Sequence, residues 1–377
     1  MKVLVAGAGI GGLCLAQGLV RAGIDVRVFE REGAADSRYQ GFRIGLDEPG
    51  LAALRECLPP RLHGLLAAVT GPLAGERRVV DEQLTELRRL GPTGGGTAAD
   101  RHVLRQLLLA GLGDRVEFGR AVVGYRERAD GRVEARFADG TGVLGDLLVG
   151  ADGVGSAVRR QLLPGAEVAT VPGGALLGRT PMTERLAALV PGAGTLVQGP
   201  GASLLIGRMD FRRPPRLAAA ELAPEVELPD TGSYLRWVVM LPEPLTGPAP
   251  TDWAQVRDRL LVLVRDWHPD LVELVRRSDV GNSSPLTFRY SEPVPHWGTG
   301  PVTLLGDAIH PMPPSAGQGA NLAFRDAALL CRSLTAVHRG EAELPSALQE
   351  YELRMLDRGF TAVAAGLARL PDFTPSR

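Results

Sequence analysis

The sequence predicts an α/β protein in which a Rossmann-like domain with a parallel sheet carries an inserted antiparallel-sheet domain. Three short apolar runs, at residues 3–6, 147–149 and 302–305, each lead into a glycine-rich turn and then a helix-compatible segment. Residues 168–284 instead carry strand-like stretches that are separated by Pro-rich turns. Strands that alternate with helices form parallel sheets, whereas consecutive short strands form antiparallel ones.

Length and charge restrict the partners that this chain is expected to bind. At 377 residues it is longer than one core usually supports, so we expect two domains or one domain with a large insertion. The charges of the 42 basic and 43 acidic residues nearly cancel. The chain therefore lacks the excess of positive charge that is typical of proteins that bind nucleic acids or anionic membrane surfaces. We therefore expect a small-molecule substrate, no nucleic acid and no stable membrane association.

The cysteines and the amino terminus indicate where the protein works. Cys14, Cys57 and Cys331 are odd in number and far apart, unlike a zinc site or a disulfide framework. We expect buried thiols in a reducing cytoplasm and no metal centre. The apolar amino terminus runs into a glycine cluster instead of a signal-peptide cleavage site, so we expect a cytoplasmic, unprocessed protein.

The first motif is a strand, a glycine turn and a helix. The strand at 3–6 is followed by Gly7-Ala8-Gly9-Ile10-Gly11-Gly12, and a helix-compatible segment runs from Leu13 to Arg21. In a dinucleotide-binding turn, Gly7 would allow the tight turn, Gly9 the approach of a pyrophosphate, and Gly12 the packing of helix on strand.

An acid at the end of the second strand supports dinucleotide binding. The strand Asp25–Phe29 ends at Glu30, where a carboxylate can hold both hydroxyls of an adenosine ribose and disfavours the phosphate of NADP. A glycine turn alone is a weak signal, but the flanking strand, helix and acid together favour a dinucleotide. These residues alone leave FAD and NAD both open.

The second and third motifs also follow buried strands. After 147–149, the turn 150–159 carries Asp152, Gly153 and Arg159; by itself it also fits a plain helix start that is capped by Ser156. After 302–305, Asp307 offers a carboxylate for a polyol. The Gly-x-Gly before the helix 321–334 leaves N–H groups for a phosphate or a reduced flavin ring.

The insertion is predicted to form an antiparallel sheet over a shared cleft. We expect strands at 195–198, 203–209 and 234–241 and a helical stretch over 252–277. Along the last strand, Tyr234 and Arg236 point to one side and Leu235 and Trp237 to the other, and the pattern leaves open which side faces the cleft.

We predict a discontinuous domain over 1–167 and 285–377 and a substrate domain over 168–284, with added strands from about 73–95.

The three motifs, in this order and at these separations, resemble the single-component (group A) FAD-dependent aromatic hydroxylases. This p-hydroxybenzoate hydroxylase-like family includes the tetracycline-inactivating monooxygenases, and the resemblance spans almost the whole chain. It implies that the first motif binds the ADP half of FAD, the second serves FAD and the incoming nicotinamide, and the third binds the ribityl chain. The residues assigned to the cofactor are Gly7, Gly9, Gly11, Gly12, Leu13, Glu30, Arg31, Arg43, Arg101, Asp152, Arg159, Gly306, Asp307, Pro314, Gly317, Gln318, Gly319, Ala320 and Asn321.

The resemblance also implies an activity. It predicts an FAD-dependent monooxygenase, monomeric or homodimeric, that uses NAD(P)H and dioxygen. A flavin C4a-hydroperoxide would hydroxylate or epoxidise an aromatic or polyketide-like small molecule. No side chain is assigned as acid or base; the backbone at Pro314 and Gly319 is expected near the flavin, and His310 is given a structural or flavin-proximal role. A flavin-dependent reductase or dehydrogenase without oxygenation, or a non-catalytic flavin-binding protein, remains an alternative.

Overall fold

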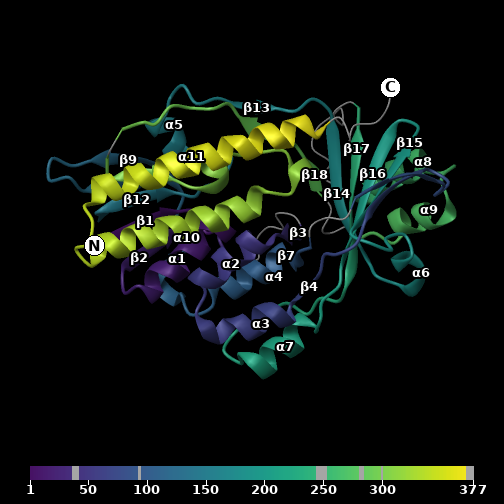
Figure 1. Ribbon diagram of the computed structural model, residues 1–377, viewed down its shortest axis with the longest axis horizontal. Helices are drawn as coiled ribbons and strands as arrows, with labels where there is room; N and C mark the ends of the chain where they lie inside the picture. Colours follow the sequence, from purple (N-terminus) through teal and green to yellow (C-terminus); the bar gives the residue numbers. More distant parts are fainter. Residues whose placement is uncertain (36–41, 92–94, 243–252, 280–283, 299, 371–377) are drawn as a thin grey trace.

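The computed structural model describes residues 1–35, 42–91, 95–242, 253–279, 284–298 and 300–370. Figure 1 shows two parts: one surrounds a parallel sheet and carries the long carboxyl-terminal helices, and the other is built on a large sheet of long strands. Within these residues the parallel sheet has five strands and the large sheet has seven. The predicted fold class is confirmed.

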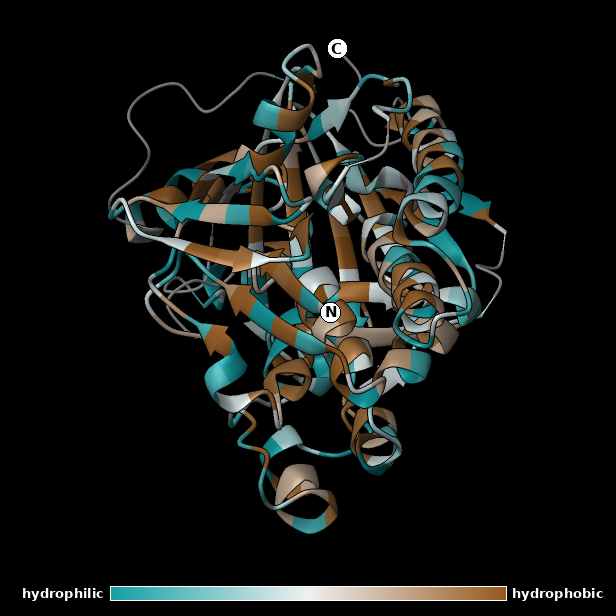
Figure 2. Cartoon of the chain, turned by 90° about the vertical axis from the view of Figure 1, so that its left-hand side faces the viewer, coloured by the Kyte–Doolittle hydropathy of each residue, from teal (hydrophilic) through white to brown (hydrophobic). Residues whose placement is uncertain are grey.

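The parallel sheet forms the centre of the first part. Its strands, in spatial order, are β20 (Val302–Leu304), β12 (Leu147–Gly150), β1 (Lys2–Ala6), β2 (Asp25–Phe29) and β8 (Val116–Glu117). β1, β12 and β20 are almost entirely buried, as expected for continuous apolar runs in a sheet that is covered on both faces. Figure 2 shows brown apolar strands in the interior and teal residues along the outside of the helices.

Helices and a small sheet cover these strands. α1 (Ile10–Arg21) packs against α10 (Gly319–His338), which also contacts α2 (Glu48–Cys57) and α11 (Leu344–Ala368). In Figure 1, α10 and α11 run side by side across this part of the molecule. An antiparallel sheet of β9 (Val122–Glu127), β10 (Val133–Phe137) and β11 (Gly142–Gly145) packs on β12 and adds apolar side chains to the same core.

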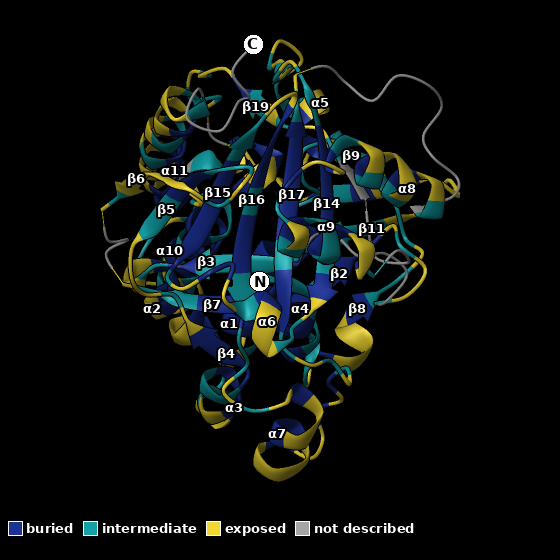
Figure 3. Cartoon of the chain, turned by 90° about the vertical axis from the view of Figure 1, so that its right-hand side faces the viewer, coloured by how far each residue is buried: buried dark blue, intermediate teal, exposed yellow. Residues whose placement is uncertain are grey.

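The seven-stranded sheet forms the second part. Its order is β18 (Ser284–Leu286), β14 (Gly174–Pro181), β17 (Tyr234–Leu241), β16 (Ala202–Met209), β15 (Gly194–Gly199), β5 (Arg77–Asp81) and β6 (Glu86–Leu90). All neighbours are antiparallel except β5 and β15, which are parallel. β5 and β6 precede the insertion in sequence but join its sheet. Figure 3 shows the central strands largely in dark blue, because both of their faces are covered.

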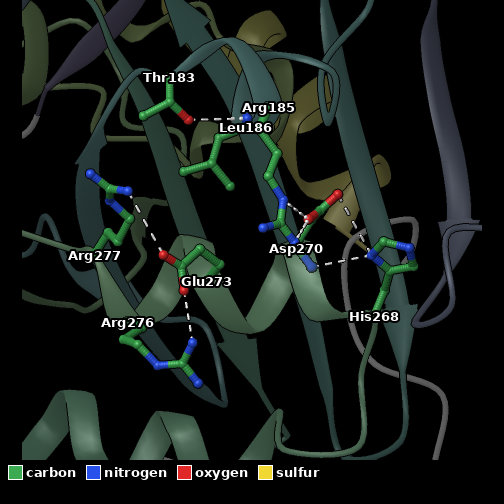
Figure 4. Close-up of polar contacts among 8 residues, drawn as sticks. All are labelled: Thr183, Arg185, Leu186, His268, Asp270, Glu273, Arg276 and Arg277. Atoms are coloured by element: carbon green, nitrogen blue, oxygen red, sulfur yellow. Dashed lines mark hydrogen bonds and ion pairs between the residues drawn. The ribbon is translucent and has the colours of Figure 1, made fainter.

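Helices cover one face of this sheet. α6 (Glu184–Ala187), α8 (Trp253–Leu263) and α9 (Pro269–Arg276) pack there. The predicted helical stretch 252–277 is thus two helices; residue 252 lies outside the described part. The break precedes Pro269 because proline disfavours the helical conformation of the residue before it. In Figure 4, the carboxylate of Asp270, at the start of α9, pairs with Arg185 of α6. The Asp270 N–H donates a hydrogen bond of 3.2 Å to the ring Nδ1 of His268, the residue before Pro269.

Shorter elements connect the two parts. A three-stranded antiparallel sheet contains β3 (Arg43–Leu46), β7 (Thr97–Asp100) and β4 (Thr70–Pro72), and β13 (Val168–Thr170) pairs with β19 (Arg289–Ser291). The remaining α-helices of the described residues are α3 (His63–Ala68), α4 (Arg101–Leu109), α5 (Ala157–Leu162) and α7 (Pro215–Leu222). Short 3-10 helices lie at Pro60–Leu62, Gly113–Arg115, Gly306–Ala308 and Pro314–Ala316. The domain boundaries stated above remain a prediction.

The three cysteines, although far apart in sequence, gather beside Gly18 of α1. All are free thiols; Cys14 and Cys57 are buried and Cys331 is partly buried. Hydrogen bonding to Cys14 and burial raise the pKa of Cys57, while hydrogen bonding to Cys57 and burial raise that of Cys331. Cys57 and Cys331 are poor nucleophiles as a result. Separately, none of the described helices combines the length and apolarity that crossing a bilayer demands.

Candidate active site

The carboxyl ends of neighbouring parallel strands bring the three motifs together. Backbone hydrogen bonds join the strands at these ends: the Ala151 N–H donates to Ala6 O at 2.8 Å, and the Leu305 N–H donates to Gly150 O at 3.0 Å. Ligands of open α/β sheets bind beyond this edge. Motifs from both ends of the chain therefore face one site.

A cavity of about 1460 Å³ extends from this edge to the seven-stranded sheet. It exceeds the usual volume of a pocket for one drug-sized ligand, which is at most about 1,000 Å³. The predicted residues that line it are Gly7, Gly9, Gly11, Gly12, Glu30, Arg31, Arg43, Arg101, Asp152, Gly306, Asp307, Pro314, Gly317, Gln318, Gly319, Ala320 and Asn321. Two others, Leu13 and Arg159, lie behind the wall, where Leu13 is fully buried.

The glycine turn after β1 leaves room for a ligand at one position only. Gly7 has a φ of 104°, and a Cβ there would lie 2.4 Å from Ala151 O. A Cβ on Gly12 would lie 2.2 Å from Gly7 O, so α1 could not pack so closely on the turn. In contrast, no described atom lies within 4 Å of a Cβ built on Gly9, which faces the cavity. The backbone at Gly9 is therefore open to a phosphate.

Glu30 is held in position by backbone groups and by an arginine that the sequence reasoning did not single out. Its carboxylate accepts hydrogen bonds from the N–H of Ala8 at 2.8 Å and of Glu32 at 3.0 Å. Buried Arg105 lies 3.6 Å from this carboxylate and donates to Ala8 O at 2.9 Å. Arg105 follows Arg101 by four residues on α4, a spacing that places both on one helix face and could have identified it.

Asp152 performs a structural task and keeps one oxygen free. Its Oδ2 accepts from the Ala157 N–H at 2.7 Å at the start of α5, where Ser156 caps the Arg159 N–H at 2.9 Å. The capped-helix interpretation of this segment is thus correct for Ser156. The buried Oδ1 of Asp152 has no hydrogen-bond partner within the described chain. An unpaired buried carboxylate oxygen beside a cavity is suited to a ligand hydroxyl.

Asp307 and Arg101 place opposite charges on the cavity wall. Asp307 follows β20, and Arg101 begins α4, where its N–H donates to Phe42 O at 2.7 Å. Burial lowers the pKa of Arg101, and the nearby Asp307 carboxylate partly opposes this shift. This corner therefore presents one carboxylate and one guanidinium group to a ligand.

The amino-terminal end of α10 is open toward the cavity. No side chain caps it in the described structure, and its first backbone hydrogen bond runs from the Leu322 N–H to Gln318 O at 2.9 Å. The preceding residues 319–321 line the cavity with the positive end of the helix dipole. This end can stabilise negative charge on a bound group.

Asn321 links α10 to β3. Its Nδ2 donates to Gly45 O at 3.0 Å and to Gly317 O at 3.1 Å, and its Oδ1 accepts from the Asp47 N–H at 3.1 Å. Asn321 is predicted to face the cofactor through its backbone N–H, and its side chain is engaged with three other backbone groups. It positions the start of α10 against β3.

A buried charged cluster supports the third motif from behind. Asp326 is fully buried; it accepts from His310 Nε2 at 2.7 Å, from Arg358 at 3.1 Å and from the Gly306 N–H at 3.2 Å. Burial acts to lower the pKa of His310, but the charge and hydrogen bond of Asp326 outweigh it, so that pKa is raised. His310 lies behind the cavity wall, in a structural position.

The seven-stranded sheet closes the cavity with a mostly apolar face. Arg236, Val238 and Met240 of β17 line the cavity together with residues of β14 and β16. Trp237 points to the opposite face, where its Nε1 donates to Thr180 Oγ1 at 3.1 Å within the core under α8 and α9. The sequence left open which face of this strand lines the cleft, and in the structure it is the face that carries Arg236.

Comparison with known proteins agrees with this geometry. The family described as "FAD binding domain" matches residues 101–365. The dual O-methyltransferase/FAD-dependent monooxygenase CTB3 of Cercospora beticola is 33% identical over 393 residues, covering 94% of this chain and 44% of CTB3. The chain therefore spans less than half the length of that relative.

Solved structures share the whole fold. A protein of Photorhabdus luminescens described as an FAD-containing monooxygenase is 32% identical with a TM-score of 0.81, covering 99% of both chains. HpxO of Klebsiella pneumoniae, solved with FAD and uric acid, is 26% identical with a TM-score of 0.77. That match covers 98% of this chain and 87% of HpxO.

Proposed function

This chain belongs to the family of single-component FAD-dependent monooxygenases, and from that premise we propose that it oxygenates a small molecule with NAD(P)H and dioxygen. The proposed reaction is hydroxylation or epoxidation of an aromatic or polyketide-like substrate. The observation that carries the proposal is the convergence of three motifs on one cavity that is large enough for a dinucleotide and a second molecule. We further propose that the enzyme works in the cytoplasm, where NAD(P)H is available.

The residues present fit FAD. The backbone at Gly9 is open, the Oδ1 of Asp152 is unpaired, and the start of α10 is uncapped. In the proposed arrangement, Gly9 and Glu30 would hold the pyrophosphate and the adenosine ribose. Asp307 and Arg101 would bind the ribityl chain and adjacent phosphate, and residues 319–321 would face the flavin ring.

Bound FAD supplies the redox chemistry: once reduced, it activates dioxygen for transfer of one oxygen atom to the substrate. The protein contributes electrostatics and shape. The N–H groups of residues 319–321 would stabilise negative charge on the reduced ring. Apolar side chains such as Val238 and Met240 would exclude water and hold the substrate against the ring. Pro314 and Gly319 would form the backbone wall beside the reacting atoms.

The test is to purify the protein and measure bound FAD, NADH and NADPH oxidation, and dioxygen uptake with phenols, quinones and polycyclic polyketides. Isotopically labelled dioxygen should place one labelled atom in the product. Nicotinamide oxidation with an unlabelled product would favour a reductase, and bound FAD without any turnover would favour a flavin-binding protein. A protein that binds no FAD would contradict all three functions.

A further inference from the structure

Two arginines from separate parts of the chain meet at the sheet side of the cavity. Arg43 begins β3, and Arg236 lies in the middle of β17; both line the cavity. Their guanidinium groups share one neighbour, Gly207 of β16. A Cβ built on Gly207 would lie 2.5 Å from Arg43 Nη1 and 3.8 Å from Arg236 Nη2. The absence of a side chain at Gly207 makes room for both cations.

Neither charge has a carboxylate within ion-pair distance among the described residues, although the charge of Asp210 partly opposes the lowering of the Arg43 pKa by burial. Arg236 has no hydrogen-bond or ion-pair partner in the described residues, and its buried Nε is unpaired. Arg43 makes one long hydrogen bond, of 3.5 Å from Nη2 to Ala193 O, and its Nε is also buried and unpaired. Burial, and secondly the charge of Arg43, lower the pKa of Arg236 to about 9. Arg236 is still protonated near neutral pH, so two like charges remain side by side.

The nearby carboxylates are already engaged elsewhere. Asp210 accepts from Arg208 Nε at 2.8 Å, and Asp100 accepts from the Tyr234 hydroxyl at 2.6 Å. A third carboxylate, Asp279, pairs with Arg179, which faces Arg236 across the β14–β17 register. The acids that line the cavity are Glu30, Asp152 and Asp307 of the three motifs, and Asp47, whose carboxylate caps α2. The sheet side therefore combines apolar walls with an unbalanced pair of cations.

We propose that Arg43 and Arg236 form an anion subsite that binds a carboxylate, or an equivalent delocalised oxyanion, of the aromatic substrate. The proposal rests on the proposed function and narrows its substrate to an acid. Buried cations without partners are costly, and an anion that accepts charge-assisted hydrogen bonds from both removes the like-charge repulsion. Planar guanidinium groups suit a planar carboxylate, and the apolar residues Leu177, Leu205 and Val238 suit the attached ring.

This subsite gives Arg43 a role different from the predicted cofactor contact. Its side chain leaves the Rossmann-like part and reaches the backbone of residues 193 and 207 in the large sheet. Arg101 directly follows Asp100, the β7 partner of Arg43, and the charge of Asp307 acts on it. In the proposed arrangement Arg101, and not Arg43, is the cation that binds FAD. Arg43 and Arg236 would thus determine which substrates bind and in what orientation they lie.

The test uses the FAD-loaded protein and two probes of equal shape, 2-naphthoate and its neutral amide, 2-naphthamide. Equilibrium dialysis without NAD(P)H measures both affinities independently of turnover. Wild-type protein should bind the carboxylate at least about tenfold more tightly than the amide. The variants Arg236→Met and Arg43→Met should each reduce this preference to about twofold or less, while keeping bound FAD.

Arg276→Met is the control, because Arg276 is an exposed arginine of α9, on the sheet face opposite the cavity, and does not line the cavity. It should keep the wild-type preference. If a Met variant does not fold, Arg236→Lys should fold and retain part of the preference. Equal affinity for both probes in the wild type, no binding of the carboxylate, or an unchanged preference in both Met variants would overturn the subsite. A wild-type protein that prefers the carboxylate but binds no FAD, or transfers no oxygen, would instead contradict the proposed function.

Discussion

Arg159 Nη1 donates a hydrogen bond of 2.8 Å to the backbone carbonyl of Ala308, and its Nη2 donates to Val154 O at 2.9 Å. The first acceptor belongs to the third motif and the second to the turn after β12. One buried guanidinium therefore determines the spacing between two loops that both face the cavity. The family resemblance assigned Arg159 to the cofactor, whereas its contacts in the structure are to the protein backbone.

Replacing Arg159 with Met should weaken FAD binding indirectly. Two charge-assisted hydrogen bonds would be lost, with a decrease in unfolding free energy of about 2–3 kcal/mol. Urea denaturation and FAD titration of the apoprotein would measure both effects. The exposed Arg136→Met, on β10, is the control and should change neither. A variant of Arg159 that loses FAD affinity with unchanged stability would instead indicate direct contact with the cofactor.

Two glycine substitutions should separate folding from cofactor binding. Gly12→Ala places a Cβ 2.2 Å from a backbone oxygen, so it should lower the unfolding free energy of the apoprotein by about 1–3 kcal/mol. Gly9→Ala meets no described atom within 4 Å, so the apoprotein should keep its stability while FAD affinity falls. Chemical denaturation of both apoproteins, followed by FAD titration, makes the comparison. Equal destabilisation by both substitutions would contradict the open position at Gly9.

Asp307→Ala should release FAD. We expect a decrease in affinity of about 10- to 100-fold, because a carboxylate that accepts hydrogen bonds from ribityl hydroxyls contributes about 1.5–3 kcal/mol. The flavin absorbance of the purified protein and titration with FAD would measure this. Asp130→Ala, in the exposed turn between β9 and β10, is the control. Full occupancy in the Asp307 variant would mean that the ribityl chain lies elsewhere.

The stability of the protein should depend on pH through His310. Because the folded-state pKa of His310 is raised above its ordinary value of 6.5, protonated His310 stabilises the fold fully below that pH. This contribution should be lost as the pH rises through the higher folded-state pKa. Urea denaturation of the wild type and of His310→Asn, repeated from about pH 6 to pH 9, would measure it. Parallel pH profiles for the two proteins would contradict a raised pKa.

Removing Asp326 should be more damaging than removing His310. Asp326 is the shared acceptor for His310, Arg358 and the Gly306 N–H, so Asp326→Ala leaves buried His310 and partly buried Arg358 without this acceptor. We expect a loss of about 3–5 kcal/mol, which is typical when one partner of a buried ion pair is removed. Thermal or urea denaturation of the two single variants gives the comparison. If Asp326→Ala lowered the free energy of unfolding less than His310→Asn does, Asp326 would not be the residue that holds the third-motif loop in place.

Local patterns were sufficient wherever a feature depends on neighbouring residues. The strands at 25–29 and 234–241 have the predicted bounds, because alternation and turn signals lie within the segment itself. The helical stretch 252–277 was predicted without its break, although Pro269 is a local signal. Arg105 was overlooked because its partners at Glu30 and Ala8 come from another strand end.

By itself the sequence determined the fold class, the three strand–turn motifs and their order, since each depends on backbone conformations that short segments dictate. Only the tertiary structure decided which side chains face the cavity. In the folded chain, Arg159 donates a hydrogen bond to the backbone of Ala308, and Arg236 lines the cavity. The tertiary structure also brought Arg43 to the large sheet beside Gly207. The direction of a charged side chain depends on partners that are distant in sequence, and these are known only once the chain is folded.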